Sequence, residues 1–170
     1  MEGVPFVISI SAIGQDSHRF MSEDKSAMSG RVLMLGGLSI PGCPSLEGNS
    51  DADVVLHALT NAISGLTGVR ILGAVADEMA KRGITDSSAY VERALQELRG
   101  MRLKHLSFSV EAQRPYLAHY IDPMRGRIAN LTGLSIDHVA ITVTSGEELT
   151  AFGRGEAIQC FCIASAVLDA

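Results

Sequence analysis

The chain reads NSDADVVLHALTNA at residues 49–62, and this pattern predicts a helix that begins at a polar cap. Ser50, followed three residues later by Asp53, resembles a capping box with a shortened acid. The apolar positions that follow at helical spacing are Val54, Leu56, Leu59 and Ala62. The pattern therefore places His57 about one turn inside the helix. By itself, a single His on a half-apolar helix is more often a packed or surface residue than a ligand.

A second pair of polar residues lies upstream, in the sequence GQDSHRF at residues 14–20. If this segment is extended, Asp16 and His18 leave the same face, because strand side chains alternate. With His57 they supply a carboxylate and two imidazoles, which are protein ligands of zinc. Structural zinc usually has four protein ligands, whereas three leave a position open for a substrate oxygen or water. We therefore predict that Asp16, His18 and His57 converge on one catalytic metal ion.

Turn and cap signals divide the rest of the chain into strands and helices. Predicted strands cover residues 6–14, 103–112, 139–144 and 157–168, and a hairpin covers 31–40 with Gly36-Gly37 at its turn. Predicted helices cover residues 49–66, 71–81, 87–98 and 122–131. Thr85 or Asp86 caps the third helix, Asp122-Pro123 begins the fourth, and residues 22–30 read as a polar loop. Because helices do not join all the strands, the order favours one α+β domain over residues 1–170.

Composition limits the function. A chain of 170 residues with 46% hydrophobic content can bury one good core. The net charge of −5, without a basic stripe, argues against a nucleic-acid partner, so a phosphate ligand needs a local binding site. The N-terminal residues show neither a secretion signal nor a membrane span. We expect a cytoplasmic protein of a bacterium, or an organellar protein whose transit segment has been removed.

The three cysteines are Cys43, Cys160 and Cys162, an odd number with poor spacing for a mutual disulfide. We expect reduced thiols that pack as small apolar residues. In the last predicted strand, Phe161 and Ile163 alternate with the cysteines, so both faces need cover. A neighbouring subunit would supply it, and so would a central position in the sheet of a monomer.

Four blocks of sequence, in one order across almost the whole chain, resemble the family of 2-C-methyl-D-erythritol 2,4-cyclodiphosphate synthases. They are residues 14–20, residues 49–57, AQRP at 112–115, and TSGE at 144–147 with GRGE at 153–156. No block is specific alone, but their shared order and compatible spacing make chance agreement improbable. The resemblance implies a ferredoxin-like βαβ domain with helices on one face of a mixed sheet. It also implies a homotrimer whose sheets face the axis and whose active sites lie between neighbouring subunits.

In enzymes of this family, the 2-phosphate of a cytidine diphosphate ester of methylerythritol attacks the β-phosphorus, which closes a cyclic diphosphate and expels CMP. The resemblance assigns zinc, one ion per subunit, to Asp16, His18 and His57. It assigns a second cation, Mg2+ or Mn2+, to Glu147, because carboxylate and phosphate oxygens suit such ions. The site must hold two anionic groups together, which requires positioning and electrostatic stabilisation.

The same resemblance implies catalytic roles for Asn49 and Ser145. The implied substrate-binding residues are Asp16, Ser17, His18, Asn49, Ser50, Asp77, Thr144, Ser145, Gly146, Glu147 and Arg154. The implied cytidine-binding residues are Ala112, Gln113, Arg114, Pro115, Tyr116 and Leu117, which hold the base largely through backbone contacts.

Several positions depart from the family pattern. Asn49 stands where most members carry a His, and an amide donates a hydrogen bond but carries no charge. Residues 70–73 replace the usual polyol-binding segment, while Asp77 keeps the place of the next acid. Glu148 and Tyr116 each replace a Lys. The chain therefore reads as a divergent enzyme with less positive charge around its anionic ligand.

Two other functions are compatible with the same three ligands. One is a catalytically silent trimer that binds zinc and a nucleotide. The other is a zinc phosphohydrolase in which the open metal position activates water. The hydrolase would need a further acid or base, and the nearest candidates, Asp51 and Asp53, read as helix-start acids.

Overall fold

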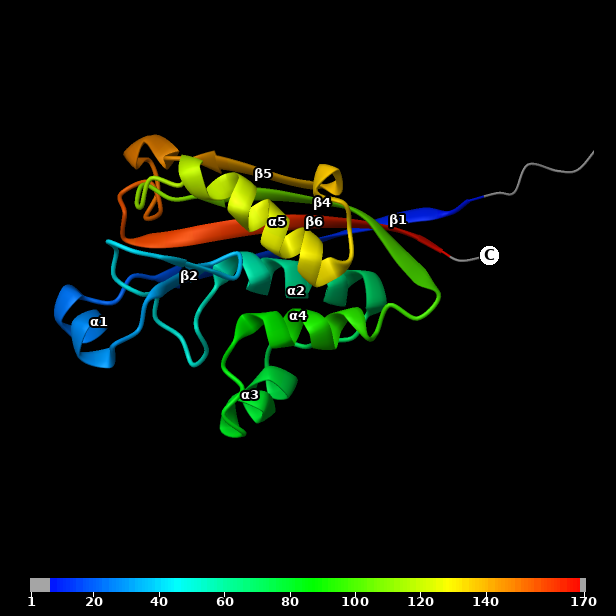
Figure 1. Ribbon diagram of the computed structural model, residues 1–170, viewed down its shortest axis with the longest axis horizontal. Helices are drawn as coiled ribbons and strands as arrows, with labels where there is room; N and C mark the ends of the chain where they lie inside the picture. The colour runs from blue at the N-terminus through cyan, green and yellow to red at the C-terminus, as the bar shows by residue number, and fades with distance from the viewer. Residues whose placement is uncertain (1–6, 169–170) are drawn as a thin grey trace, which may run out of the picture.

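The computed structural model describes residues 7–168, in which a four-stranded mixed sheet carries the metal-ligand candidates at one edge (Figure 1). The strands are β1 (Ser9–Arg19), β4 (Met101–Glu111), β5 (Val139–Thr144) and β6 (Ala157–Leu168), in the order β1-β6-β4-β5. β6 is antiparallel to both β1 and β4, whereas β4 and β5 are parallel. A parallel pair needs a crossover, and α5 (Ile121–Thr132) supplies it.

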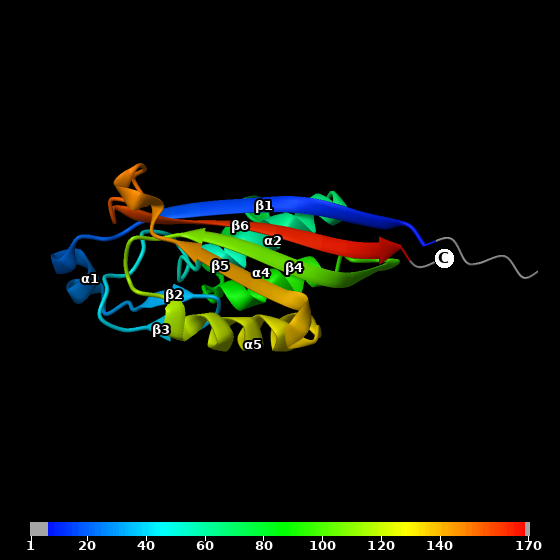
Figure 2. The same ribbon diagram turned by 90° about the horizontal axis from the view of Figure 1, so that it is seen from above.

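Helices cover one face of this sheet, as predicted, and Figure 2 shows the strands in front of α2 and α4. α2 (Val54–Thr67) packs on β1 and β6, α4 (Ser87–Leu95) packs on α2, and α5 packs on β5. The smaller elements are α1 (Glu23–Ser29), α3 (Ala74–Lys81), the hairpin β2 (Leu33–Leu35) and β3 (Leu38–Ile40), and the 3-10 helices η1 (Ala118–Tyr120), η2 (Ile136–His138) and η3 (Gly146–Glu148).

The core lies between the sheet and α2, where small side chains allow a close approach. The inner face of β6 buries Cys160, Cys162 and Ala164, and all three cysteines of the chain are free thiols, as predicted. On β1, a Cβ at Gly14 would lie 2.1 Å from the Ala58 backbone oxygen and 2.2 Å from the Ala62 nitrogen. Only glycine tolerates this contact, so β1 and α2 meet at their backbones.

The start of α2 corrects the predicted capping box. The cap is Asp53, whose Oδ1 accepts hydrogen bonds from the backbone N–H groups of Val55 and Leu56, both at 3.0 Å. The same buried carboxylate accepts from Gly36 and Gly37 at the turn of the β2–β3 hairpin, at 2.9 and 2.6 Å. Asp53 therefore joins the helix to the hairpin. Ser50, the predicted cap, lies before the first turn and contacts His57 instead.

Three further predictions about elements need correction. Residues 23–29 are helical rather than a loop, because Ser22 caps α1 and Gly30 ends it in a left-handed conformation. α5 begins at Ile121, directly after η1, so Asp122 lies in its first turn and is not its cap. Strand β1 extends from Ser9 to Arg19 and unites two segments predicted separately; residue 6 of the first segment lies outside the described residues.

The connection order also corrects the ferredoxin-like arrangement. Helices follow β1 and β4, and β5 then returns to β6 through η3 and a loop, giving β-α-β-α-β-β. A ferredoxin-like domain has the order β-α-β-β-α-β. The difference arises because β4 and β5 form the parallel, helix-connected pair, whereas β6 inserts between β1 and β4.

The other face of the sheet keeps apolar side chains exposed. Ile13 on β1 and Ile163 on β6 are paired across the two strands and are 63% and 46% exposed. β6 is a central strand, which is one of the two positions that its sequence predicted. Helices nevertheless cover only its inner face. Within residues 7–168, no helix is long and apolar enough to cross a membrane.

Candidate metal centre

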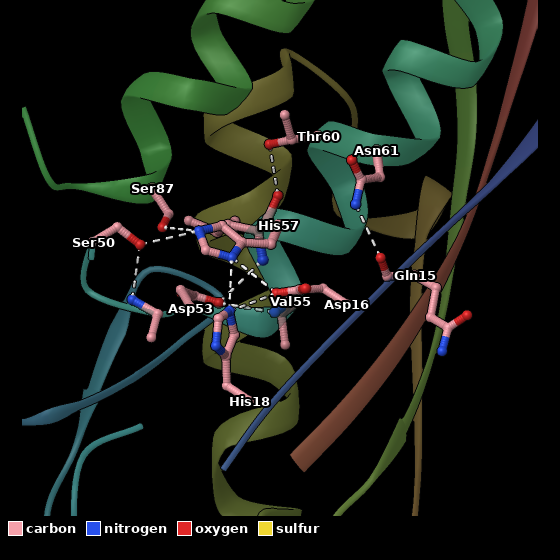
Figure 3. Close-up of polar contacts among 12 residues, drawn as sticks. Gln15, Asp16, His18, Ser50, Asp53, Val55, His57, Thr60, Asn61 and Ser87 are labelled. Atoms are coloured by element: carbon pink, nitrogen blue, oxygen red, sulfur yellow. Dashed lines mark hydrogen bonds and ion pairs between the residues drawn. The ribbon is translucent and has the colours of Figure 1, made fainter. Parts of the chain in front are cut away.

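Asp16, His18 and His57 meet at the edge of the sheet, as the sequence predicted (Figure 3). Asp16 Oδ2 lies 3.0 Å from His18 Nε2 and 2.9 Å from His57 Nδ1, and the two ring nitrogens are 3.4 Å apart. Each residue can offer one ligand atom to a metal, and these atoms all lie within 4.8 Å of one another. One carboxylate oxygen and two imidazole nitrogens are a donor set that fits zinc and leaves room for a further ligand.

Local structure explains why these side chains meet. Gly14, Asp16 and His18 share the face of β1 that is turned toward α2. The backbone contact at Gly14 draws the strand onto the helix, and Asn61 of α2 donates a hydrogen bond to the Gln15 carbonyl at 2.9 Å (Figure 3). His57, in the first turns of α2, therefore lies against Asp16.

The electrostatics of the group favour a bound positive charge. Burial opposes ionisation of Asp16, but the hydrogen bonds from His18 and His57 outweigh it and hold the pKa of that carboxyl well below its usual range. The hydrogen bond to Asp16 raises the pKa of His18 against the effect of burial. Asp16 is thus stabilised in the charged form, which is the form in which a carboxylate can act as a metal ligand.

Two hydroxyl groups lie on the far side of the His57 ring. Nε2 is 2.9 Å from Ser87 Oγ and 3.2 Å from Ser50 Oγ. Ser87 also donates a short hydrogen bond to Asp51. Sequence reasoning missed Ser87 and read Asp51 only as a helix-start acid. A Ser at the beginning of a helix looks like an ordinary capping residue, and no local pattern indicates that it faces His57.

A cavity of about 210 Å³ opens beside the three ligands, between β1, α2 and α3. Asn49, Ser50 and Asp77, all predicted to bind substrate, line it together with Asp16, His18 and His57. Tyr90 and a small apolar surface complete the wall; that surface consists of Leu72, Gly73, Ala76 and Ala80. Ser17 lies on the opposite face of β1 and lines a neighbouring cavity together with His18 and Arg19, so its contact with substrate stays a prediction.

The predicted cytidine segment forms a second cavity, of about 240 Å³, beside β4 and β5. Its lining includes Ala112, Gln113, Pro115, Tyr116 and Leu117, and also Ser145. Arg114 turns away: its guanidinium lies 4.6 Å from the centre of the Phe20 ring, and its Nε donates to the Gly155 carbonyl at 3.1 Å.

The predicted phosphate loop follows β5 as a tight turn. Ser145 Oγ donates to Glu147 Oε1 at 2.8 Å, and the Gly146 N–H donates to Thr144 Oγ1 at 3.3 Å. Gly146, Glu147 and Glu148 all have positive φ, of 72°, 48° and 62°. The loop therefore keeps Ser145 and Glu147 together in a conformation that non-glycine residues rarely adopt.

Arg154, predicted to bind substrate, lies at the exposed start of the return to β6. Its Nε donates to Glu156 Oε1 at 2.8 Å. This contact joins two exposed side chains, and Arg154 does not line the cavity of the metal ligands or that of the cytidine segment.

The two cavities belong to opposite edges of the sheet. The metal ligands lie at β1 and the cytidine segment at β4 and β5, and β6 and β4 separate β1 from β5. Three strand spacings amount to about 14 Å. Within one chain, the metal ligands and the loop of Ser145 and Glu147 therefore do not meet.

Comparison with known proteins gives the family. The YgbB family profile matches residues 10–167. The 2-C-methyl-D-erythritol 2,4-cyclodiphosphate synthase of Chlamydia muridarum (strain MoPn / Nigg) is 46% identical over 153 residues, which are 89% of this chain and 84% of that protein. The bifunctional IspDF from Campylobacter jejuni superposes with a TM-score of 0.84 at 26% identity, over 96% of this chain and 43% of that one.

A 2C-methyl-D-erythritol-2,4-cyclodiphosphate synthase solved in a CDP-bound form superposes with a TM-score of 0.78 at 26% identity, over 91% of this chain and 98% of that one. Sequence and fold thus agree over nearly the whole described chain. The chain belongs to the YgbB family.

Proposed function

We infer that this protein converts 4-diphosphocytidyl-2-C-methyl-D-erythritol 2-phosphate into 2-C-methyl-D-erythritol 2,4-cyclodiphosphate and CMP, a step of non-mevalonate isoprenoid synthesis. The observation that carries this conclusion is the convergence of Asp16, His18 and His57 on one point at the wall of an open cavity. A relative that is 46% identical to this chain bears the name of this activity.

The reaction is an internal phosphoryl transfer. An oxygen of the 2-phosphate forms a bond to the β-phosphorus, the bond from that phosphorus to the bridging oxygen breaks, and CMP leaves with the electron pair. Zinc held by the three ligands supplies a Lewis acid for a phosphate oxygen. The protein's own task is to bring two anionic groups together in the attacking geometry.

Residues in the metal cavity suit this task. The Asn49 amide can donate a hydrogen bond to a phosphate oxygen, and the Ser50 hydroxyl lies beside it. Asp77 on α3 can accept hydrogen bonds from the polyol hydroxyls. In this proposal Asn49 orients the attacking phosphate without contributing a charge.

The loop after β5 binds the nucleotide phosphates. The Ser145 hydroxyl and the Gly146 N–H are the donors, and Ser145 assists catalysis at the leaving phosphate. The Glu147 carboxylate, whose described partner is Ser145, would hold a second cation, Mg2+ or Mn2+, which would neutralise phosphate charge. Cytosine occupies the cavity of residues 112–117, consistent with the CDP-bound form of a solved relative.

A homotrimer, with the sheets facing its axis, completes the site. Two observations support this assembly: the outer face of β1 and β6 exposes the apolar pair Ile13 and Ile163, and the cavity of the metal ligands and that of the cytidine segment lie at opposite edges of one sheet. A neighbouring copy that packs against this face would bring its own nucleotide cavity to the metal ligands. Within one chain, Ser17 and Arg154 line neither of these two cavities. In the trimer they would line the joint site or the interface.

The test is to incubate the purified protein with the cytidylated substrate, zinc and magnesium. CMP with the cyclic diphosphate supports the synthase. CMP with an open-chain phosphate product indicates a hydrolase, and no turnover with retained zinc and CDP binding indicates a silent binder. In His57→Ala, zinc and activity should both disappear while circular dichroism stays unchanged. Stoichiometric zinc in that variant would contradict the metal assignment.

A further inference from the structure

We propose that Ser87 and Asp51 are positioning residues that keep a proton on Nε2 of His57, so that its Nδ1 presents a lone pair to the metal. The inference rests on the proposed metal centre and deepens it. Neither residue belongs to the cavity lining, so their effect on the site passes through the imidazole.

The Asp51 carboxylate accepts three hydrogen bonds. The Ser87 N–H donates to its Oδ2 at 3.0 Å, the Ser87 hydroxyl donates a short hydrogen bond to its Oδ1, and the Asp53 N–H lies 3.3 Å from Oδ1. An ionised carboxylate can only accept hydrogen bonds. The Ser87 hydroxyl therefore uses its one proton in the hydrogen bond to Asp51.

The hydrogen bond from Ser87 to Asp51 determines which ring nitrogen of His57 carries the hydrogen. A Ser hydroxyl has one proton, so once it donates to Asp51, its oxygen can act toward the ring only as an acceptor. Nε2 lies 2.9 Å from that oxygen and must carry the hydrogen. Ser50 Oγ, at 3.2 Å, can share this hydrogen because a hydroxyl oxygen accepts as well.

Nδ1 faces Asp16 Oδ2 at 2.9 Å and His18 Nε2 at 3.4 Å. A metal ion held by these residues would take the place of the hydrogen bond between Nδ1 and Asp16. With the hydrogen of the neutral ring held on Nε2, the electron pair of Nδ1 is free for that ion. The opposite tautomer would place a proton where the metal binds.

The contact is built into the junction of two helices. The Asp51 N–H donates to the Thr85 carbonyl at 2.9 Å, just before α4, and Ser87 is the first residue of α4 and is fully buried. Tyr90, one turn further along α4, lies beside the His57 ring with centroids 6.1 Å apart. α4 thus orients a ligand that α2 carries.

The experiment measures zinc affinity by competition with a chromophoric chelator at fixed pH, in the wild type, Ser87→Ala and Ser88→Ala. Ser88 is the matched control, because it is nearly as buried at the same helix start but donates to Asp86 at 2.6 Å instead of facing His57. We expect Ser87→Ala to bind zinc about 10- to 100-fold more weakly, as is typical for loss of an outer-shell partner. Ser88→Ala should match the wild type.

A second readout requires no variant. In zinc-loaded protein labelled with ¹⁵N-histidine, long-range ¹H–¹⁵N spectra should show the ring proton of His57 on Nε2. A proton on Nδ1, or equal zinc affinity in Ser87→Ala and the wild type, would overturn the inference while leaving the proposed function intact. Failure of the wild type to take up zinc would overturn the proposed metal centre and this inference together.

Discussion

Gly14 is the residue through which β1 approaches α2 closely enough for the metal ligands to meet. Its missing side chain leaves the space occupied by the Ala58 oxygen and the Ala62 nitrogen. Asp16 and His18 follow on the same strand face, so any displacement of β1 at Gly14 moves both ligands relative to His57.

We therefore expect Gly14→Ala to lower the free energy of unfolding by about 3 kcal/mol, at the upper end of the cost of overpacking. Urea unfolding followed by circular dichroism measures this change. The matched control is Gly126→Ala in α5, where the nearest atom to an added Cβ is 3.9 Å away. Helix propensity should make that variant about 0.5–1 kcal/mol more stable. Equal effects of the two substitutions would show that the contact at Gly14 can relax.

Asn49→His tests the missing charge in the metal cavity. A protonated imidazole would donate a charge-assisted hydrogen bond to phosphate, worth about 1 kcal/mol more than a neutral one, or roughly fivefold in Kd. KM for the cytidylated substrate should fall by about this factor below pH 6.5. Zinc content serves as the control and should not change. If KM and kcat both stay at their wild-type values, other groups orient the phosphates.

Among the structural elements, the turn that contains η3, directly after β5, carries a strong backbone constraint near the proposed nucleotide cavity. A Cβ at Gly146 would lie 2.3 Å from Glu111 Oε1 and 2.9 Å from the Gly153 Cα atom, and the residue has a φ of 72°. Glu111 in turn makes a short hydrogen bond with Thr150, which accepts from the Gly153 N–H. The turn is thus packed between Glu111 on β4 and the segment that contains Thr150 and Gly153.

Gly146→Ala should disturb this turn without touching the metal ligands. We expect weaker CDP binding and a kcat/KM lower by about 10- to 1000-fold, the range for misplaced phosphate donors. Calorimetric titration with CDP and a steady-state assay measure these effects, and elemental analysis should find wild-type zinc. A loss of zinc would mean that the two halves of the site are coupled within one chain.

Element ends that depend only on neighbouring residues agree with the sequence prediction. The Gly36-Gly37 turn and the cap at Asp86 are decided by nearby residues, and both were predicted correctly in kind. The sequence favours Ser50 as the cap of α2, although Ser50 and Asp53 both have capping side chains. Asp53 takes that role because the Gly36 and Gly37 N–H groups, distant in sequence, also bind its carboxylate.

At the scale of the whole molecule, an exposed apolar pair on the outer face of the sheet bears on how copies of the chain would associate. Ile13 and Ile163 lie side by side on the face of the sheet that the helices leave uncovered. Packing of this face against other copies would remove apolar surface from water and bring metal and nucleotide halves together.

Ile163→Lys should therefore dissociate the proposed trimer. Light scattering coupled to gel filtration should give a mass near 18.0 kDa in place of three times that value. The variant should keep zinc affinity and lose most activity. Val69→Lys, an exposed apolar position beyond the end of α2, is the control and should remain assembled and active.

Mixed assemblies provide a sharper test of the same proposal. His57→Ala subunits lack one of the three proposed metal ligands, and Gly146→Ala subunits have a disturbed loop at the proposed nucleotide cavity. Co-refolded mixtures should regain part of the wild-type activity, because some interfaces combine two intact halves. Mixtures as inactive as the separate variants would place the complete site in one chain.

Asp16, His18 and His57 could be predicted from the sequence alone, since only a few residue types bind a metal and their spacing within a strand or a helix is a local property. The order of strands and helices likewise predicted the α+β class, whereas the phosphate and base segments are predictions from the family resemblance. The tertiary structure decided what depends on contacts between distant segments: the backbone approach at Gly14, the insertion of β6 beside β1, and the contact of Ser87 with His57. These contacts leave no local pattern, because each requires complementary surfaces from separate parts of the chain.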